Sequence, residues 1–206
     1  MRSDAIIIGA LTALGLAGIG GLYFASQPAT AASHAAADGP GPNLEITVAG
    51  EANGTVVIDL LDDVAPAHVE QITALAEEGA YDGVVFHRVI EGFMAQTGDV
   101  QFGTAEGGLA QAGMGGSERP DLPAEFSDVP FERGVVGMAR AQDPNSANSQ
   151  FFIMFGPAEH LNGLYTVVGR VVEGMDVVDA IKKSDGAPSG IVSETPDMME
   201  SVTVVR

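Results

Sequence analysis

The sequence predicts a mainly β domain in which a closed or sandwiched antiparallel sheet is accompanied by two helices. Seven short runs rich in β-branched and aromatic residues follow Leu44, and clusters of Gly, Pro, Asn and Asp separate them. The runs are LEITV, TVVIDL, VVFHRV, GVVGMA, QFFIMF, YTVVGRVV and SVTVV. Two other segments carry apolar residues at helical spacing. Because a barrel removes strand edges but leaves its two ends open, we expect the helices to plug a barrel.

The first 31 residues predict an export signal. Arg2 precedes an uncharged apolar run over residues 5–25, and residues 29–31, Ala-Thr-Ala, fit a small-x-small cleavage site. The run is also long enough to cross a bilayer if uncut, so residues 1–31 are a signal peptide or a signal anchor. The positive-inside rule keeps Arg2 in the cytoplasm, so the rest of the chain is expected to be periplasmic or otherwise exported. If the signal is not cut, residues 5–25 would anchor the chain to the inner membrane.

Residues 32–43 predict a flexible linker, and residues 44–206 predict a single folded domain. The linker consists largely of alanines followed by Asp-Gly-Pro-Gly-Pro, which has too little apolar content to pack. The remaining length suits one domain with one core.

Helices are expected over residues 65–78 and over residues 175–183. Val69, Ile72 and Leu75 share one face of the first segment. A proline suits its first turn, and a glycine follows its last residue. The second segment is shorter and ends in two lysines, which complement the negative end of a helix dipole.

The run VVFHRV places an arginine beside apolar surface. The period-two rule for a strand predicts that Phe86 and Arg88 lie on the same face. Phe93 and Met94 then bring an aromatic ring and a thioether just after a turn. Gln96 adds an uncharged hydrogen-bonding amide. Such a group is typical of a site that binds an apolar ligand through a few polar contacts.

Residues 98–131 predict a long ordered loop, because they are rich in Gly, Ala, Asp and Pro and show little periodicity. A loop of this length inside a compact domain is usually functional, so it is expected to wall a surface groove. A tolerated insertion is the alternative, since lengthening a loop costs little entropy. The sequence leaves both interpretations open.

A second chemically suggestive segment covers residues 137–155, GMARAQDPNSANSQFFIMF. In its last strand, Gln150 and Phe152 are predicted on one face, with Phe151 and Ile153 on the other. If one face packs inward, the other exposes an aromatic ring and an amide. Such exposure is typical of a surface that a ligand covers.

Composition excludes several classes of function. With 28 acidic against 9 basic residues, the chain has a formal net charge of -19 and repels phosphate backbones, so no nucleic-acid partner is expected. The absence of cysteine excludes disulfides and catalytic thiols. His34, His68, His87 and His160 lack metal-type spacing, so neither a metal nor another cofactor is expected.

Three ordered motifs resemble the cyclophilin family. They are FHRVIEGFMAQTGD at residues 86–99, MARAQDPNSANSQFFI at 138–153 and HLNGLYTVVGRVVEGMDVVDAI at 160–181. The resemblance extends over essentially all of residues 44–206. It implies an eight-stranded antiparallel barrel capped by two α-helices, with a proline-binding groove on its outside. It also implies peptidyl-prolyl cis/trans isomerase activity.

The resemblance implies roles for individual residues. Arg88 resembles the family's essential arginine, and Phe93 and Gln96 are placed with it as catalytic. The implied substrate-binding residues are Met94, Ala139, Arg140, Gln150, Phe152, His160, Leu161 and Tyr165.

Three of these positions depart from the best-known eukaryotic pattern. His160 stands in place of a tryptophan, Tyr165 in place of a histidine and Arg140 in place of an asparagine. The missing indole argues against tight cyclosporin binding. If the backbone of Arg140 makes the substrate contact, this replacement matters less. Its side chain is still expected to adjust the preference for residues that flank proline, in favour of an acidic neighbour.

We therefore expect a monomeric, exported isomerase that acts on X-Pro bonds in unfolded or loop segments of envelope proteins. A proline-peptide-binding chaperone or interaction module with incidental turnover is the alternative, because the same groove residues serve both. A hydrolase that uses the many carboxylates is disfavoured, since no nucleophile or metal set accompanies them.

Overall fold

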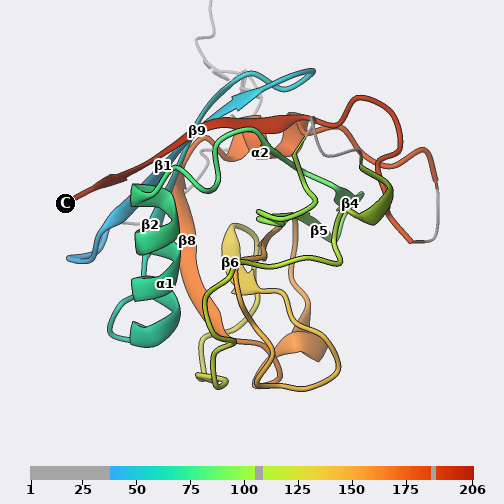
Figure 1. Cartoon of the computed structure of the whole chain (residues 1–206). Coiled ribbons are helices and arrows are strands. Elements are labelled where there is room, and N and C mark those ends of the chain that lie inside the picture. Colours follow the sequence, from blue (N-terminus) through green and yellow to red (C-terminus); the bar gives the residue numbers. More distant parts are fainter. Residues whose placement is uncertain (1–37, 105–108, 187–188) are drawn as a thin grey trace, which may run out of the picture. The chain divides into compact units, whose positions relative to one another are not determined.

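The computed structural model describes residues 38–104, 109–186 and 189–206 (Figure 1). The predicted export signal over residues 1–31 lies outside the described residues, as does the predicted linker up to residue 37. None of the helices within the described ranges is both long and apolar enough to span a bilayer.

The end of the predicted linker lies against the domain. The amide of Leu60 donates a hydrogen bond of 3.0 Å to the carbonyl of Pro42, directly before the first strand. Gly39 lies close enough to Asp59 that an added Cβ would meet its carboxylate oxygens at 2.9 Å. Residues 38–42 therefore extend the edge of the folded domain.

One antiparallel sheet of nine strands dominates the described part of the chain, in the order β3-β9-β1-β2-β8-β6-β7-β5-β4. Figure 1 shows these strands following one another in a curve from β9 through β8 to β4 and β5. The strands are β1 (Asn43–Ala49), β2 (Gly54–Leu60), β3 (Val84–Val85), β4 (Arg88–Ile90), β5 (Met94–Thr97), β6 (Val135–Met138), β7 (Phe151–Met154), β8 (Val167–Glu173) and β9 (Met198–Val205). The mainly β, barrel-like class is confirmed.

The run VVFHRV forms two strands instead of one. Two residues separate β3 from β4 in the chain, yet these strands stand at opposite ends of the sheet order. Phe86 packs into the interior, whereas Arg88 lies opposite Gln96 on the outer side. The prediction that Phe86 and Arg88 share a face is therefore wrong, because alternation holds only along an unbroken strand.

The nine strands of the described ranges exceed by two the seven runs read from the sequence, and by one the eight strands that the resemblance implies. The break in VVFHRV adds one strand, and β5 is a further strand that the sequence pattern did not indicate. β5 has only one β-branched residue, Thr97, and it follows directly on a turn around Gly92. Its pairing with β4 and β7 stabilises a segment of weak intrinsic strand propensity.

The interior of the barrel is a continuous apolar cluster to which both helices contribute. Alternate residues of β1 and β2 supply its centre, as in Leu44, Ile46 and Val48. Helix α1 (Pro66–Glu77) adds Val69, Ile72 and Leu75, and helix α2 (Met175–Ala180) adds Val178. α1 packs on β9 and α2 packs on β2. The two predicted helices therefore cap the core, at nearly the predicted positions.

A second, smaller apolar cluster lies on the outer side of the sheet, and we call it the outer cluster. Its buried members are Leu61, Met94, Phe131, Phe152, Met154, Ala158, Leu161 and Val167. Along β7 the side chains alternate between the two clusters, since Phe151 and Ile153 belong to the interior. The face assignment made for this strand from the sequence is confirmed. The outer cluster is the base on which the candidate site is built.

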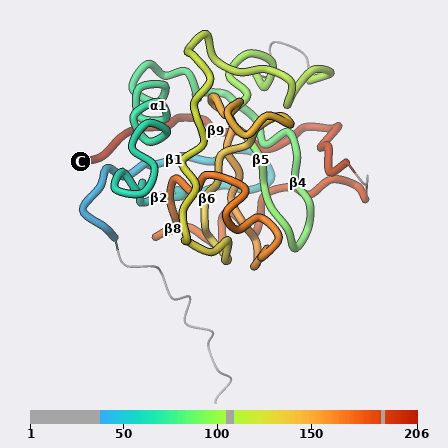
Figure 2. Tube along the Cα trace, turned by 90° about the horizontal axis from the view of Figure 1, so that it is seen from below, coloured from blue at the N-terminus to red at the C-terminus, as the bar shows by residue number. Residues whose placement is uncertain are grey.

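The described parts of the long segment, residues 98–104 and 109–131, are held against the domain near both ends of the segment. The buried carboxylate of Asp99 accepts four backbone hydrogen bonds, from the amides of Gln101, Phe102, Gly113 and Gly115, at 2.7–3.1 Å. Figure 2 shows the yellow-green part of the segment running along the side of the barrel beside α1. The described parts of the segment, residues 98–104 and 109–131, therefore form an ordered wall rather than a loosely held insertion.

The far end of this segment caps helix α1. Ala65 provides no side-chain cap, and the carboxylate of Glu125 instead accepts the amides of Ala67 and His68 at 3.2 and 3.1 Å. The ring of buried His68 also contacts this carboxylate at 2.6 Å. These backbone and ring contacts lower the pKa of Glu125, against the effect of burial, which is the largest single influence and raises it.

Replacing Glu125 by alanine is expected to lower the free energy of unfolding by about 1–3 kcal/mol, because α1 loses its N-terminal acceptor. Urea unfolding at neutral pH measures this change. Glu132→Ala removes an exposed carboxylate from the neighbouring turn and should change stability by less than about 0.5 kcal/mol. Equal stability of the Glu125 variant and the wild type would contradict the capping role.

Candidate active site

A pocket of about 320 Å³ lies on the outer cluster, and we call it the apolar pocket. Its lining residues are Arg88, Phe93, Met94, Gln96, Ala139, Arg140, Phe152, His160, Leu161 and Tyr165. All of them were singled out from the sequence. The remaining predicted residue, Gln150, lies next to this pocket and hydrogen-bonds to Gln96. The fold therefore brings every predicted site residue into one place.

Phe152 forms the floor of the apolar pocket and is held from both sides. Its ring stacks on Phe131 at 5.7 Å between centroids and meets the edge of Tyr165 at 5.9 Å. Only 5% of Phe152 is exposed, so these neighbours already cover much of the ring that the strand pattern predicted to be exposed. A Cβ on Gly137 would come within 2.6 Å of both Phe131 and Phe152, so only glycine fits beneath this floor.

The apolar side walls come from two separate parts of the chain. Phe93 stacks on His160 with 5.8 Å between ring centroids. Leu161 ends the short 3-10 helix Glu159–Leu161 and is buried in the outer cluster, as is Met94 of β5. A five-membered ring presented to these walls would replace water against apolar surface on several sides.

Arg88 is the fixed cation at the edge of this pocket. Its Nε donates to the carbonyl of Ser189 at 2.9 Å, and Nη1 donates to Gln96 Oε1 at 3.2 Å. Nη1 also lies 3.8 Å from the sulfur of Met94. Burial lowers the pKa of Arg88, yet a guanidinium stays protonated at any physiological pH. These contacts hold the charge in one orientation and leave N–H groups for a ligand.

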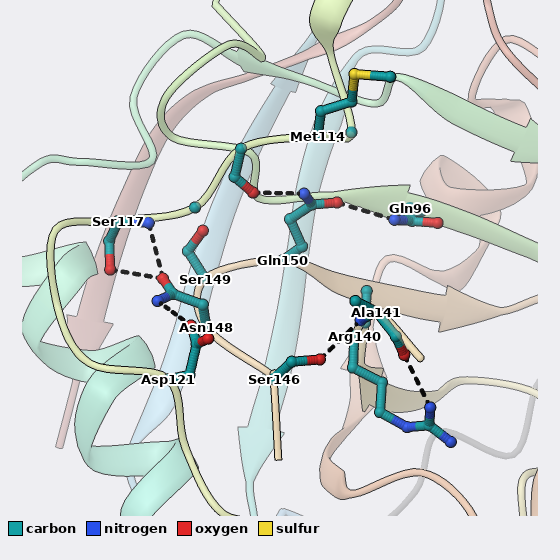
Figure 3. Close-up of a pocket in the computed structure, with 14 residues that line it drawn as sticks. Gln96, Met114, Ser117, Asp121, Arg140, Ala141, Ser146, Asn148, Ser149 and Gln150 are labelled. Atoms are coloured by element: carbon teal, nitrogen blue, oxygen red, sulfur yellow. Dashed lines mark hydrogen bonds between the residues drawn. The ribbon is translucent and has the colours of Figure 1, made fainter. Parts of the chain in front are cut away.

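A chain of amide hydrogen bonds extends from Arg88 toward the long wall. Gln96 Nε2 donates to Gln150 Oε1 at 2.9 Å, and Gln150 Nε2 donates to the carbonyl of Gly115 at 2.8 Å. The amide of Gly115 in turn donates to Asp99 at 3.0 Å. Figure 3 shows Gln96 and Gln150 joined in this way. Asp99 therefore fixes the loop that orients the two glutamines and, through them, Arg88.

A larger and more polar pocket of about 560 Å³ adjoins the first, and we call it the polar pocket. Gln96, Ala139 and Arg140 line both pockets. Figure 3 shows its remaining side chains, which come from the long wall and from the turn before β7. They include Met114, Ser117, Asp121, Ala141, Ser146, Asn148, Ser149 and Gln150, with backbone from Gly113, Gly115 and Gly116.

Sequence reasoning left open whether residues 98–131 wall a groove, and it did not single out Ser117, Asp121 or Asn148 as site residues. Asn148 organises the wall, because its Oδ1 accepts the amide and hydroxyl of Ser117 at 2.7 Å and its Nδ2 donates to Asp121 at 2.9 Å. The Pro-Asn turn before β7 was visible in the sequence. That this turn meets residues around Ser117 depends on tertiary packing alone.

Behind the glutamines lies a buried histidine that the sequence did not assign to the site. His87 is 4% exposed, and neither ring nitrogen has a hydrogen-bond partner among the described residues. A Cβ on Gly113 would meet its ring at 3.1 Å, which places the ring against the start of the wall. Within the described residues, no three His, Asp or Glu side chains are grouped so as to hold a metal ion.

Comparison with known proteins identifies a family for residues 44–204. They match the family described as cyclophilin type peptidyl-prolyl cis-trans isomerase/CLD. A probable peptidyl-prolyl cis-trans isomerase of Brucella suis is 60% identical over 154 residues, which cover 74% of this chain and 78% of that protein. Peptidyl-prolyl cis-trans isomerase CYP18-1 of Arabidopsis thaliana is 37% identical over 141 residues, covering 66% and 81%.

Solved structures show the same fold. The cyclophilin AquaCyp293 from Hirschia baltica aligns with a TM-score of 0.64 and 26% identity, covering 81% of this chain and 74% of that one. A Cryptosporidium parvum cyclophilin solved in the presence of the dipeptide Ala-Pro aligns with a TM-score of 0.66 and 23% identity, covering 80% and 99%. The predicted fold class is therefore confirmed.

Stability is expected to fall in mild acid because of His87. Burial lowers the pKa of His87, and the nearby Asp99 carboxylate only partly opposes this. The unfolded chain therefore binds a proton at His87 at a higher pH than the folded chain does. The stabilising contribution is present above the unfolded pKa of about 6.5 and is lost as the pH falls below it.

The measurement is the free energy of unfolding in urea at about pH 7.5 and about pH 5.5. The loss between the two pH values should be smaller in His87→Gln than in the wild type. His160→Gln, which removes an exposed histidine, is the matched control. An identical loss in His87→Gln and the wild type would show that His87 does not contribute.

Proposed function

Since this chain belongs to the cyclophilin-type peptidyl-prolyl cis-trans isomerase family, we propose that its apolar pocket holds the proline ring of an X-Pro bond and that Arg88 is its main catalytic residue. Isomerase activity itself is the activity of the family and of its curated relatives, and it is therefore the activity of this chain. The observation that supports the residue assignment is a fixed guanidinium at the edge of a pocket with aromatic and aliphatic walls.

The reaction requires rotation about a bond, and no bond is broken. The X-Pro amide has partial double-bond character and a barrier of about 18–20 kcal/mol, so uncatalysed exchange takes tens to hundreds of seconds. Rotation removes the resonance, which leaves a localised lone pair on the prolyl nitrogen and a smaller dipole on the carbonyl. The enzyme must therefore bind the twisted amide more tightly than either planar form.

Arg88 supplies a donor whose direction is set before the substrate arrives. A guanidinium N–H aimed at the prolyl nitrogen stabilises the lone pair that appears only in the twisted state. Because Ser189 and Gln96 already hold the guanidinium, little reorganisation is needed during rotation. One charge-assisted hydrogen bond of about 1.5–3 kcal/mol corresponds to about one to two decades of rate.

The rest of the site holds the substrate still while one side of the amide turns. Phe93, Phe152 and Leu161 enclose the proline ring and remove water that would favour the more polar planar amide. Gln96, Gln150 and the backbone near Ala139 hold the flanking peptide. The acyl side is then the part that rotates.

Arg88→Ala is expected to lower kcat/KM for a proline peptide by about 10- to 100-fold, with little change in the fold. Arg88→Lys should recover only part of the loss, because lysine keeps the charge without the planar fork. Arg206→Ala removes an arginine that pairs with Glu77 away from both pockets and serves as control. A fully active Arg88→Ala enzyme would exclude the proposed role.

We also propose that the enzyme is exported and acts, as a monomer, on unfolded or loop segments of envelope proteins. The proposal of export is supported by Arg2 near the N-terminus, by the apolar run over residues 5–25 and by the small residues at 29–31. Proline isomerisation is slow enough to limit folding, so an isomerase placed where exported chains fold has a clear use. No nucleotide or metal is needed for a rotation.

Export predicts that the full chain, produced in a Gram-negative host, is found in the periplasmic fraction with isomerase activity. Intact mass distinguishes a chain cut after Ala31 from an uncut, membrane-bound one. Deletion of residues 1–31 should leave an active enzyme in the cytoplasm. An uncut, soluble and cytoplasmic full-length chain would refute the proposal.

A further inference from the structure

The arginines of this acidic domain are not distributed evenly with respect to carboxylates. Six arginines lie in the described residues, and four of them pair with an Asp or Glu within 4.0 Å. The paired ones are Arg119, Arg133, Arg170 and Arg206. Arg88 and Arg140 form no such pair within the described ranges, and both line the apolar pocket. In a chain with a net charge of -19, the groove thus keeps two uncompensated guanidiniums.

Arg140 is held rigidly at the boundary of the two pockets. Its guanidinium carbon lies 4.4 Å from the centre of the Tyr165 ring. Nη1 donates to the carbonyl of Ala141 at 2.9 Å, and Nη2 donates to the carbonyl of Leu164 at 3.0 Å. A charge fixed by stacking and by backbone acceptors loses little side-chain entropy when a ligand arrives.

Arg140 retains hydrogen-bonding capacity after these contacts. A guanidinium has five N–H groups, and Nη1 uses its two on the carbonyls of Ala141 and Gln142. One N–H of Nη2 contacts Leu164, while the buried Nε has no partner among the described residues. The buried Nε is closed to a ligand, so the donor that remains for one is the second N–H of Nη2, which has no acceptor among the described residues. A carboxylate is the acceptor that fits a guanidinium best.

From this geometry we propose that Arg140 is a specificity-determining residue and that the enzyme selects X-Pro segments with a carboxylate one or two residues from the proline. The inference rests on the proposed function, since it needs proline in the apolar pocket. Arg140 lines both pockets, so a peptide that leaves the apolar pocket toward the polar one passes its guanidinium. Arg88 is directed at the reacting amide, which leaves Arg140 for the neighbouring side chain.

Other charges limit where the acidic residue can lie. Asp121 lines the polar pocket and disfavours a carboxylate placed deep inside it. The acidic surface of the whole domain repels an acidic peptide at long range, but salt screens this beyond about 8–10 Å. At contact distance the Arg140 guanidinium dominates. The favoured position is therefore at the shared wall, close to the proline.

The experiment uses capped peptides in which Glu is moved through the two positions before and the two positions after a single proline. Each Glu peptide is compared with its Gln isostere, and exchange between cis and trans is followed by NMR, because a coupling protease would add its own preference. For at least one position we expect kcat/KM to be about three- to tenfold higher with Glu than with Gln. The preference should shrink as ionic strength rises.

Variants then assign the preference to Arg140. In Arg140→Gln the Glu/Gln ratio should fall to about one, while Arg140→Lys should keep part of it. Arg206→Gln removes the same charge outside both pockets and should keep the wild-type ratio. The ratio compares two peptides on one enzyme, so a change in overall activity does not disguise it.

Distinct outcomes overturn the inference and the proposed function. Equal turnover of Glu and Gln peptides at every position by the wild type would refute the selectivity and leave the isomerase intact. A preference that ignores both salt and Arg140→Gln would also refute the role of Arg140. If Arg140→Gln is inactive with every peptide, the salt response of the wild type decides instead. Absence of catalysis with any proline peptide would refute the proposed function itself.

Discussion

Burial of strand β7 on both of its faces is the constraint on which the site depends. Phe151 and Ile153 belong to the interior of the barrel, while Phe152 and Met154 belong to the outer cluster. A strand between two apolar clusters cannot shift its register by one residue without exchanging both sets of side chains. The position of Phe152, which is the floor of the apolar pocket, is therefore as fixed as the core. Gly137 lies beneath Phe152 and restricts this position to glycine, because a Cβ there would clash with the rings of Phe131 and Phe152.

The polar part of the site depends on a different kind of order. The carboxylate of Asp99 accepts hydrogen bonds from four backbone amides. One of the four donors is Gly115, whose carbonyl accepts a hydrogen bond from Gln150. Gln150 then orients Gln96, which contacts Arg88. A catalyst of bond rotation needs its donor in place before the amide twists, since any reorganisation adds to the barrier. The described parts of the long wall thus help to orient the proposed donor, although they contribute no charge to Arg88 or its glutamine partners.

Local pattern was a good guide wherever the chain forms an unbroken element. The helices over Pro66–Glu77 and Met175–Ala180 lie within the predicted segments, and the two faces of β7 were assigned correctly. The pattern failed at VVFHRV, where β3 and β4 belong to opposite ends of the sheet, and it did not indicate β5. In both places long-range pairing overrides local propensity, because a strand is stabilised by its neighbours rather than by its own sequence.

The sequence by itself determined the class of the protein, the set of residues around the apolar pocket and the net charge of -19. Residue type and order carry this information, since motifs are read along the chain. Only the tertiary structure decided which charges remain unpaired, and it placed Arg140 over Tyr165 between two pockets. It also decided that Asn148 and Asp99 hold the long wall against the glutamines. These are contacts between residues distant in the chain, and their geometry follows from the packing of the whole barrel.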